Sequence, residues 1–397
     1  MLAGLCILVG ALLGACDGQE PIANDELAEE LALLDDEGSA LDPEALGGLE
    51  QDEGTDRSEQ TPTDADRSLQ ASLDPSLSTV SQEGWAWVTA SGSLGGSDVF
   101  TGTISSSKLS TGRYLVDITP SPYMNVQVVA YGTSNAACKR VGGAGGTGPQ
   151  ISCFDPDGTL VDSAFVVVFQ SATGTHSPFA SKGAYVSSPA FGAATYSWNS
   201  TGGANTVAWN AGTQTYDVTL PGMNFANASV HATANGAVGD SCRVKNWGAG
   251  TVRVKCLDSD GDATQSQFAL TYMEDTVLSG HSGGHTWISY GSPSAPYSTA
   301  IPYFTCSTPG AFSTASAGLD IDVSLSETYA PASWVEYVPM VSDYGNSENA
   351  CKIVSWSAPG TGYRARVRCF DGDGDQIDAN SIWFTLSFIN NEYSAPC

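Results

Sequence analysis

The sequence has few basic residues and few charged residues of any kind. Only 15 of its 397 residues are Lys or Arg, against 43 Asp and Glu, and charged residues make up 15% of the chain. The formal net charge of −28 argues against a nucleic-acid-binding surface, because phosphate contacts need clustered Lys and Arg. We therefore expect no nucleic-acid partner.

Long apolar runs are lacking as well. The run at residues 1–15, MLAGLCILVGALLGA, falls short of the roughly 20 residues of a membrane-spanning helix and is typical of a signal-peptide core. The chain is long enough for two to four ordinary domains. Its 44 Gly and its low share of charge favour a turn-rich β protein over a helical bundle.

A cysteine ends the N-terminal apolar run. The letters LGAC finish at Cys16, and the chain then turns acidic at Asp17. This pattern resembles the lipobox of bacterial lipoproteins, in which the Cys is diacylated and becomes the new N-terminus after cleavage. The resemblance implies loss of residues 1–15, a lipid on Cys16, and export to a bacterial membrane, the outer membrane or cell surface more than the inner membrane. The alternative is an ordinary secretory signal that leaves Cys16 unmodified.

Residues 16–84 are predicted to form a disordered acidic tether. Positions 17–84 hold 20 Asp and Glu but only two basic residues, Arg57 and Arg67, and no aromatic residue. Such a segment cannot bury enough apolar surface to offset the entropy of ordering the chain, and self-repulsion extends it. More than half of the net negative charge therefore lies in a linker that would hold the remaining chain away from the membrane.

The rest of the chain, residues 85–397, repeats one pattern three times. We define copies one, two and three as residues 85–172, 173–275 and 276–397. Each copy has a Cys with a basic neighbour, then a second Cys that leads into an Asp-x-Asp-Gly turn. Short runs rich in Val, Thr, Tyr, Phe and Trp alternate in polarity between Gly, Asn, Ser and Pro clusters. The pattern predicts an all-β fold of three tandem antiparallel β-sandwich domains, Ig-like or jelly-roll-like. It also resembles a tandem module of uncharacterised secreted bacterial proteins, which implies no activity.

The repeat also predicts the disulfides. Each copy has its own pair on two successive strands, which selects one pairing scheme. The predicted bonds are Cys138–Cys153, Cys242–Cys256 and Cys351–Cys369. The two cysteines unique to copy three, Cys306 and Cys397, are predicted to pair with each other. Zinc is the rival interpretation, but no Cys-x-x-Cys and no His lies near any pair.

A catalytic motif and a metal motif appear and carry little weight. The segment Gly280–Gly284 matches the G-x-S-x-G pattern around a hydrolase nucleophile, here Ser282, but it lacks a strand-turn-helix context and a suitable later His. We expect no enzyme, with a serine hydrolase as the remote alternative. His281 and His285 could hold a metal together, although a chance pair in a linker is the simpler interpretation.

The Asp-x-Asp-Gly turns are the other candidate metal site. Clustered carboxylates suit calcium, and copy three offers the largest set. The candidate ligands are Asp371, Asp373, Asp375 and Asp378. We favour a hairpin turn in which Gly supplies positive φ and Asp caps its own backbone. Apart from weak calcium, no cofactor is expected.

Basic residues concentrate on the strands that carry the cysteines. Strand alternation places several of them on the face opposite the buried Cys, beside two tryptophans. The candidate ligand-binding residues are Trp247, Arg253, Lys255, Lys352, Trp356, Arg364, Arg366 and Arg368. We call this set the basic stripe. Charge and stacking together suit an anionic glycan or a phosphate, whereas the alternative is a solvated face that pairs with nearby Asp or with the tether.

Together these features predict a non-catalytic exported lipoprotein whose modules bind a cell-envelope or extracellular ligand, anionic or polysaccharide. The main alternative is a structural spacer or assembly protein of the cell surface without a ligand, in which the copies stack on one another. The membrane, reached through the N-terminal lipid, is the one partner common to both.

Overall fold

The computed structural model describes most of the chain from residue 83 onward. The described ranges are 83–99, 102–119, 125–143, 148–170, 182–188, 196–224, 228–248, 250–274, 282–299, 311–326, 337–345, 348–357 and 362–390. The expected signal peptide, Cys16, residues 16–82 of the tether, His281, Cys306 and Cys397 lie outside these ranges, whereas Glu83 and Gly84, which were assigned to the tether, are the first residues of a strand. The described part contains no helix with the length and hydropathy needed to cross a membrane.

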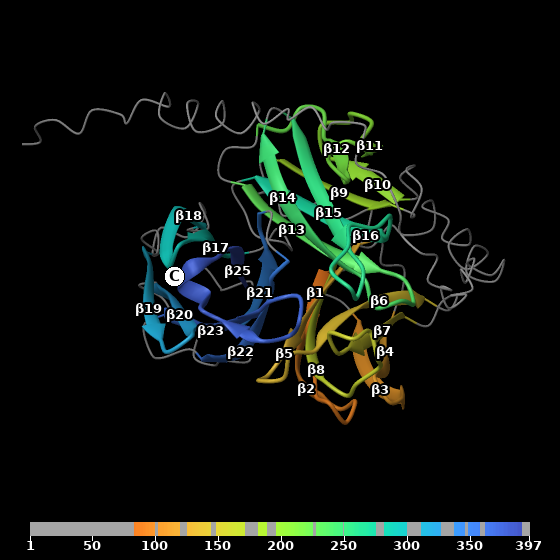
Figure 1. Cartoon of the computed structure of the whole chain (residues 1–397), viewed down its shortest axis with the longest axis vertical. Helices are drawn as coiled ribbons and strands as arrows, with labels where there is room; N and C mark the ends of the chain where they lie inside the picture. Colours follow the sequence, from red (N-terminus) through yellow and green to blue (C-terminus); the bar gives the residue numbers. More distant parts are fainter. Residues whose placement is uncertain are drawn as a thin grey trace, which may run out of the picture. The chain divides into compact units, whose positions relative to one another are not determined.

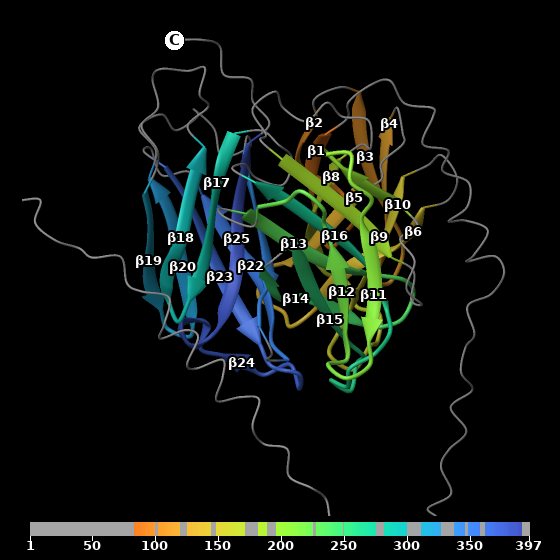
Figure 2. The same cartoon turned by 90° about the horizontal axis from the view of Figure 1, so that it is seen from above.

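The fold is all-β, as predicted (Figures 1 and 2). Copy one forms β1 (Glu83–Val88), β2 (Leu94–Val99), β3 (Thr103–Ser110), β4 (Arg113–Thr119), β5 (Asn125–Tyr131), β6 (Ala137–Gly143), β7 (Pro149–Phe154) and β8 (Ala164–Gln170). Copy two forms β9 (Lys182–Ser188), β10 (Tyr196–Asn199), β11 (Thr206–Asn210), β12 (Thr215–Thr219), β13 (Ala228–Asn235), β14 (Ser241–Gly248), β15 (Thr251–Leu257) and β16 (Gln267–Glu274).

Copy three repeats this order with two short additions. Its strands are β17 (Ser282–Ser289), β18 (Ser292–Thr299), β19 (Ala311–Ala317), β20 (Asp320–Ser326), β21 (Tyr337–Asp343), β22 (Ala350–Ser357), β23 (Gly362–Phe370) and β25 (Trp383–Asn390). The additions are β24 (Gln376–Ile377) and the 3-10 turn η3 (Ala379–Ser381).

In each copy the strands pair as two antiparallel groups of four. The Cys sheet carries the disulfide, with orders β3-β4-β7-β6, β11-β12-β15-β14 and β19-β20-β23-β22. The closing sheet contains the last strand of the copy, with orders β2-β1-β8-β5, β10-β9-β16-β13 and β18-β17-β25-β21. Both sheets therefore recur in all three copies with the same strand order.

Alternating burial explains why these segments form the Cys sheets. On β23, Ala365, Val367 and Cys369 are buried, whereas the three arginines that alternate with them, Arg364, Arg366 and Arg368, face outward. The strand β15 alternates in the same way around Val254 and Cys256. The face assignment on these two strands is confirmed, because a strand with period-2 polarity buries one face only.

Three of the predicted disulfides are confirmed. Cys138–Cys153, Cys242–Cys256 and Cys351–Cys369 each join directly opposed residues of neighbouring strands. Each bond closes a loop of 14 to 18 residues. In the loop-entropy model such a crosslink stabilises the fold by about 3 kcal/mol.

Strands of different copies pair with each other, so the sheets continue from one copy into the next. The β5 strand of copy one pairs in parallel with β22 of copy three, and β13 of copy two pairs in parallel with β6 of copy one (Figure 1). An isolated parallel bridge, Val244 to Tyr344, joins copies two and three. At each junction the closing sheet of one copy contacts the Cys sheet of another, so the three contacts form a closed cycle.

One equivalent backbone hydrogen bond closes each junction. The N–H of a Gly just after the closing-sheet edge strand donates to a carbonyl in the neighbouring copy. The bonds run from Gly132 to Ile353 (2.9 Å), from Gly236 to Arg140 (2.9 Å) and from Gly345 to Val244 (3.0 Å). All three glycines have φ near +105°, a conformation that L side chains rarely adopt.

Candidate functional site

The arginines of the basic stripe in copy three are neutralised by aspartates on the neighbouring strand β20. Arg366 donates two hydrogen bonds to Asp322, at 2.8 and 2.9 Å, and Arg364 donates to the same carboxylate. Hydrogen bonds from Arg366 and then Arg364 hold the pKa of Asp322 below its usual value, against the opposing effect of burial. The position that an anionic ligand would occupy is therefore already filled by a carboxylate.

Two further arginines of the stripe, Arg368 and Arg253, are paired with aspartates in the same way. Arg368 forms a bidentate ion pair with Asp320, with hydrogen bonds of 2.8 and 2.9 Å. In copy two, Arg253 lies 3.1 Å from Asp217. Burial and the nearby Arg243 lower the pKa of Lys255. The interpretation of this face as self-paired charge fits these contacts better than a free cationic surface does.

Lys352 was predicted to face a ligand, and this was wrong. Its side chain is 3% exposed, and Nζ donates to the carbonyls of Ser134 (2.8 Å) and Ala136 (3.3 Å) in copy one. Burial, with a smaller contribution from Arg368, lowers its pKa to about 7. The β5–β6 loop of copy one covers the position that sequence alternation had assigned to solvent.

The other two copies place an equivalent base in an equivalent junction. Lys139 of copy one donates to the carbonyl of Asp240 in copy two at 2.9 Å, and its pKa is lowered to about 8 by burial. Arg243 of copy two donates to the carbonyl of Asn349 in copy three at 2.8 Å. The basic residue next to the first Cys therefore fastens each copy to another one. The recurrence of that base was the sequence signal, although its burial was not predicted.

Trp247 and Trp356 were also assigned to the wrong face. A bulge shifts the register between Val244 and Asn246 on β14, and another between Ile353 and Ser355 on β22. Each bulge adds one residue, so the side chains beyond it change face. Trp356 consequently lies opposite the buried Ala365 and packs inward.

Both tryptophans join aromatic triads at junctions between copies. Trp356 contacts Trp87 and Tyr131 of copy one, with ring centroids 5.4 and 4.9 Å apart. Trp247 contacts Trp287 and Tyr344 of copy three, at 3.8 and 4.9 Å. The triads are built from matching positions of the repeat. In the junction of copies two and one, the same positions hold Ser187, Asn235 and Gly143. These tryptophans stabilise contacts between copies and do not form a stacking platform for a ligand.

The Asp-x-Asp-Gly segments form turns of the kind that the sequence favoured. The first Asp of each turn accepts a hydrogen bond from the backbone N–H four residues later, and the Gly has φ between +75° and +83°. Asp378 instead caps η3 by accepting from the N–H of Asn380. Nowhere in the described ranges do three or more His, Cys, Asp or Glu side chains gather as metal ligands would. The four carboxylates proposed for calcium are thus not assembled into one site.

The turn glycines also allow close contact between copies. A Cβ on Gly374 of copy three would collide with Pro156 of copy one. A Cβ on Gly158 of copy one would lie 3.2 Å from Cβ of Ser259 in copy two. Glycine at these two turns therefore has two effects: it allows positive φ, and it leaves room for side chains of the neighbouring copy.

A serine and two histidines meet in the interior between copies two and three. Ser387 Oγ lies 2.8 Å from His231 Nε2 and 3.2 Å from His285 Nδ1. Both rings are at most 1% exposed, and burial lowers the pKa of His285 to about 3. Ser387 lies within hydrogen-bonding distance of both histidines, but both rings are buried, so a substrate has no access to them. The proposed partnership of His285 with His281 in metal binding has no support, because the ring of His285 lies in this interior.

The hydrolase motif is not in a nucleophile elbow. Ser282 begins β17 and pairs with Asn390 in an antiparallel sheet, whereas the elbow requires a sharp turn between a strand and a helix. The rejection of this motif from sequence agrees with the observed strand.

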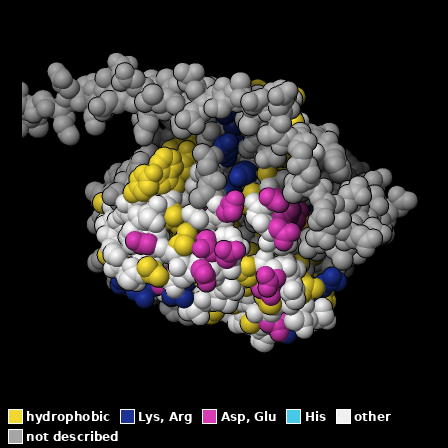
Figure 3. Space-filling model, viewed as in Figure 1, with side chains coloured by type: hydrophobic (Ala, Val, Ile, Leu, Met, Phe, Trp, Pro, Cys, Tyr) yellow, Lys and Arg dark blue, Asp and Glu magenta, His cyan; other side chains and the backbone are white. Residues whose placement is uncertain are grey.

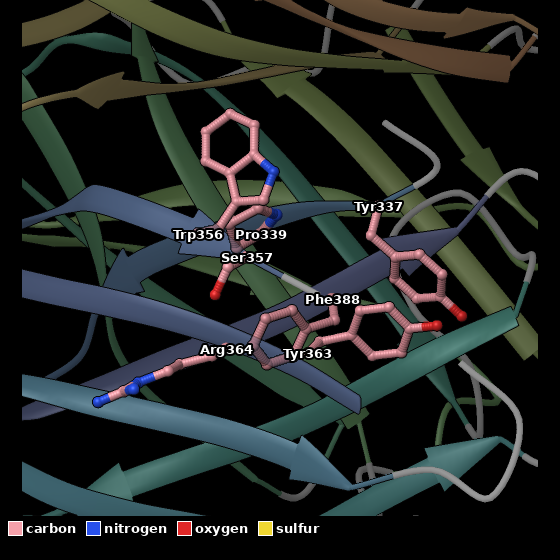
Figure 4. Close-up of a pocket in the computed structure, with 7 residues that line it drawn as sticks. All are labelled: Tyr337, Pro339, Trp356, Ser357, Tyr363, Arg364 and Phe388. Atoms are coloured by element: carbon pink, nitrogen blue, oxygen red, sulfur yellow. The ribbon is translucent and has the colours of Figure 1, made fainter. Parts of the chain in front are cut away.

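A shallow depression in copy three is lined by Tyr337, Pro339, Trp356, Ser357, Tyr363, Arg364 and Phe388 (Figure 4). The rings of Tyr337 and Tyr363 stack with centroids 3.5 Å apart, and both residues are at least 96% buried. Figure 4 shows the guanidinium of Arg364 directed away from these rings. The rings fill the space by packing on each other, so the depression offers no cavity for a ligand.

On the face drawn in Figure 3, the described Lys and Arg side chains form no extended patch. Asp and Glu side chains gather over the middle of this face, and Lys and Arg occur in smaller groups around it.

Comparison with known proteins gives no match: no family model, no curated protein and no solved structure is similar to the chain.

Two exposed aromatic residues were missed by the sequence reasoning. Tyr290 is 67% exposed and Trp383 is 37% exposed, and their ring centroids lie 5.5 Å apart at an angle of 80°. They come from the β17–β18 turn and the start of β25 in copy three. Their positions, 93 residues apart in the chain, gave no sign of a common surface.

Proposed function

We propose that this chain is a non-catalytic, exported lipoprotein whose three copies act as one firm structural unit on an acidic tether. The observation that carries the proposal is the closed cycle of equivalent junctions. Each junction combines a strand contact, a Gly hydrogen bond and a buried base that reaches into another copy. This arrangement favours the spacer or assembly function over the binding of an anionic ligand by the basic stripe.

The buried polar contacts between copies support the same function. Gln127 of copy one donates to Thr271 Oγ1 of copy two at 2.9 Å and accepts from Thr233 Oγ1 at 2.6 Å. Polar groups that are buried with matched partners fix one arrangement, since any shift would leave donors unpaired. Independent domains joined by linkers would instead present solvated faces to each other.

Calorimetry of the lipidated full-length chain tests the structural part of this proposal. Because the copies share sheets and junctions, we expect one cooperative unfolding transition that contains all three copies. Substitution of Lys352, which lies between copies three and one, should lower the midpoint temperature of this single transition. Three independent transitions, with only the one of copy three affected, would show that the copies are separate domains.

Labelling with an alkyne fatty acid in a bacterial expression host tests the membrane part. The wild-type chain should incorporate the label and sediment with membranes, whereas Cys16→Ser should do neither. An unlabelled wild-type chain that is secreted into the medium would exclude lipid anchoring. The junction proposal would remain unaffected by that result.

A further inference from the structure

The exposed pair Tyr290 and Trp383 has features of a binding surface. Only five large apolar side chains are exposed in the described part of the chain, and these two adjoin each other. The two rings meet edge to face with their planes 80° apart, and we call this exposed pair the aromatic corner. Exposed aromatic residues in contact are unusual on a surface that has no further role, because burial of each ring would be favourable.

The ring of Trp383 packs against an aromatic ring of the same copy. Its ring lies parallel to that of Tyr344, with centroids 5.4 Å apart and planes within 8°. Tyr344 in turn stacks on Trp287 at the junction of copies two and three. A ring held in this way loses little further conformational freedom when a ligand binds, which favours affinity.

Tyr290 is displayed by a strained turn. It has φ of +48° and precedes Gly291 with φ of +74°, as in the two-residue turns of tight hairpins. Asn, Asp or Gly is favoured at the first of these positions, and an aromatic residue is disfavoured there. Thr314 Oγ1 holds the turn by donating to the carbonyl of Gly291 at 2.6 Å. A strained backbone that projects an exposed ring suggests a function for that ring.

The other copies show that the repeat does not need this pair. Strand register aligns Ile288, which opposes Phe384, with Val88, which opposes Phe165. Counting from these pairs, copy one has Ala90 where copy three has Tyr290, and Ala164 where it has Trp383. The same register places Gln267 at the Trp383 position in copy two. The aromatic corner is thus particular to copy three.

We propose that Tyr290 and Trp383 form a binding site for a neutral, β-linked glycan. A pyranose with equatorial hydroxyls has a face of axial C–H bonds that packs on an aromatic ring, while the Tyr hydroxyl and Trp N–H offer hydrogen bonds at the rim. Asn380 borders the corner, since its Cβ lies close to Gly291 and its amide donates to Asp378 at 2.7 Å. Outside the tether, residues 85–397 still hold 23 Asp and Glu against 13 Lys and Arg, and this excess of negative charge disfavours an anionic glycan.

This site is independent of the structural role proposed for the three copies, and its test uses the full chain. Binding is measured by affinity electrophoresis in gels that contain hydroxyethyl cellulose and by tryptophan fluorescence during titration with chitohexaose. The variants are Tyr290→Asn, which keeps a residue suited to positive φ, and Trp383→Gln, which carries the residue of copy two. Leu109→Asn, at an exposed apolar position of copy one, is the matched control.

We expect the wild-type chain to bind at least one of the two glycans, and each variant to weaken that binding about tenfold or more. Leu109→Asn should bind as the wild type does. Binding should persist at about 1 M salt, where charge interactions are screened beyond about 3 Å. Thermal unfolding confirms the fold of each variant, and Tyr290→Asn decides the result by itself if Trp383→Gln does not fold.

Three results would overturn the proposal. The first is absence of wild-type binding to both glycans, and the second is unchanged binding by Tyr290→Asn. The third is retardation by dextran sulfate alone that disappears at high salt, which would identify an anion site. Partition of the wild type, but not of Tyr290→Asn, onto phosphatidylcholine vesicles without glycan binding would identify a lipid surface instead. None of these results bears on the junctions between copies.

Discussion

Nζ of Lys352 lies 2.8 Å from the carbonyl oxygen of Ser134, a residue 218 positions earlier in the chain. The bond crosses from copy three to copy one, and Lys139 and Arg243 make matching bonds across the other junctions. A basic residue beside a half-cystine is unremarkable in a single domain. Here each of these basic residues is buried against another copy and therefore holds two copies together.

Replacement of Lys352 by Met should lower the free energy of unfolding by about 1–3 kcal/mol, because two buried carbonyls lose their donor. Urea unfolding of the full chain measures the change. Lys108→Met is the control, since Lys108 is exposed and its pair with Asp162 should contribute at most about 1 kcal/mol. An equal effect of the two substitutions would contradict the fastening role.

Burial lowers the pKa of Lys352 to about 7 and the pKa of Lys139 to about 8, so the free energy of unfolding should change with pH in the alkaline range. Above these values the folded chain has released protons that the unfolded chain, with Lys pKa near 10.4, still holds. The unfolded state then binds more protons, so the free energy of unfolding rises with pH between about 7 and 9.5. Urea midpoints across this range should increase for the wild type and stay nearly flat for Lys139→Met/Lys352→Met. A flat wild-type profile would exclude the depressed pKa values.

Removal of the paired carboxylates should expose the arginines of copy three. Asp320→Asn/Asp322→Asn leaves Arg364, Arg366 and Arg368 without ionic partners, so we expect the variant to gain salt-sensitive retardation in dextran sulfate gels. The wild-type chain should migrate as if no polyanion were present. Strong wild-type binding that Arg366→Ser abolishes would restore the basic stripe as a ligand site.

Loss of one disulfide should destabilise the fold without changing it. Cys242→Ala/Cys256→Ala opens a loop of 14 residues and should cost about 3 kcal/mol in urea unfolding. Reduction of the wild-type chain should have a comparable or larger effect. Mass mapping of the untreated protein provides the independent check, because free thiols at these positions would contradict the pairing.

Much of the architecture could be predicted because its causes are local. Period-2 alternation placed Cys256 and Cys369 on buried faces, and the repeat selected the disulfide partners. The Asp-Gly spacing predicted the turns, since positive φ and side-chain capping act within four or five residues. These features depend on neighbours in sequence, and each copy supplied them again.

The candidate site was less predictable. The bulges on β14 and β22 reversed the faces of Trp247 and Trp356, and a single inserted residue leaves no mark in composition or polarity. The pairing of the arginines with Asp320 and Asp322 required the register of β20 against β23, which only the folded sheet supplies.

The all-β chain, its three repeated units, their internal disulfides and their turns follow from the amino-acid pattern, because alternation, Cys spacing and Gly conformation act over short distances. Which edge strands meet, which bases are buried and which aromatic side chains remain exposed depends on how the copies pack. Contacts such as Lys352 with Ser134, or Tyr290 with Trp383, join residues roughly 100 to 200 positions apart. Their energies depend on burial and register, which exist only after the copies have packed.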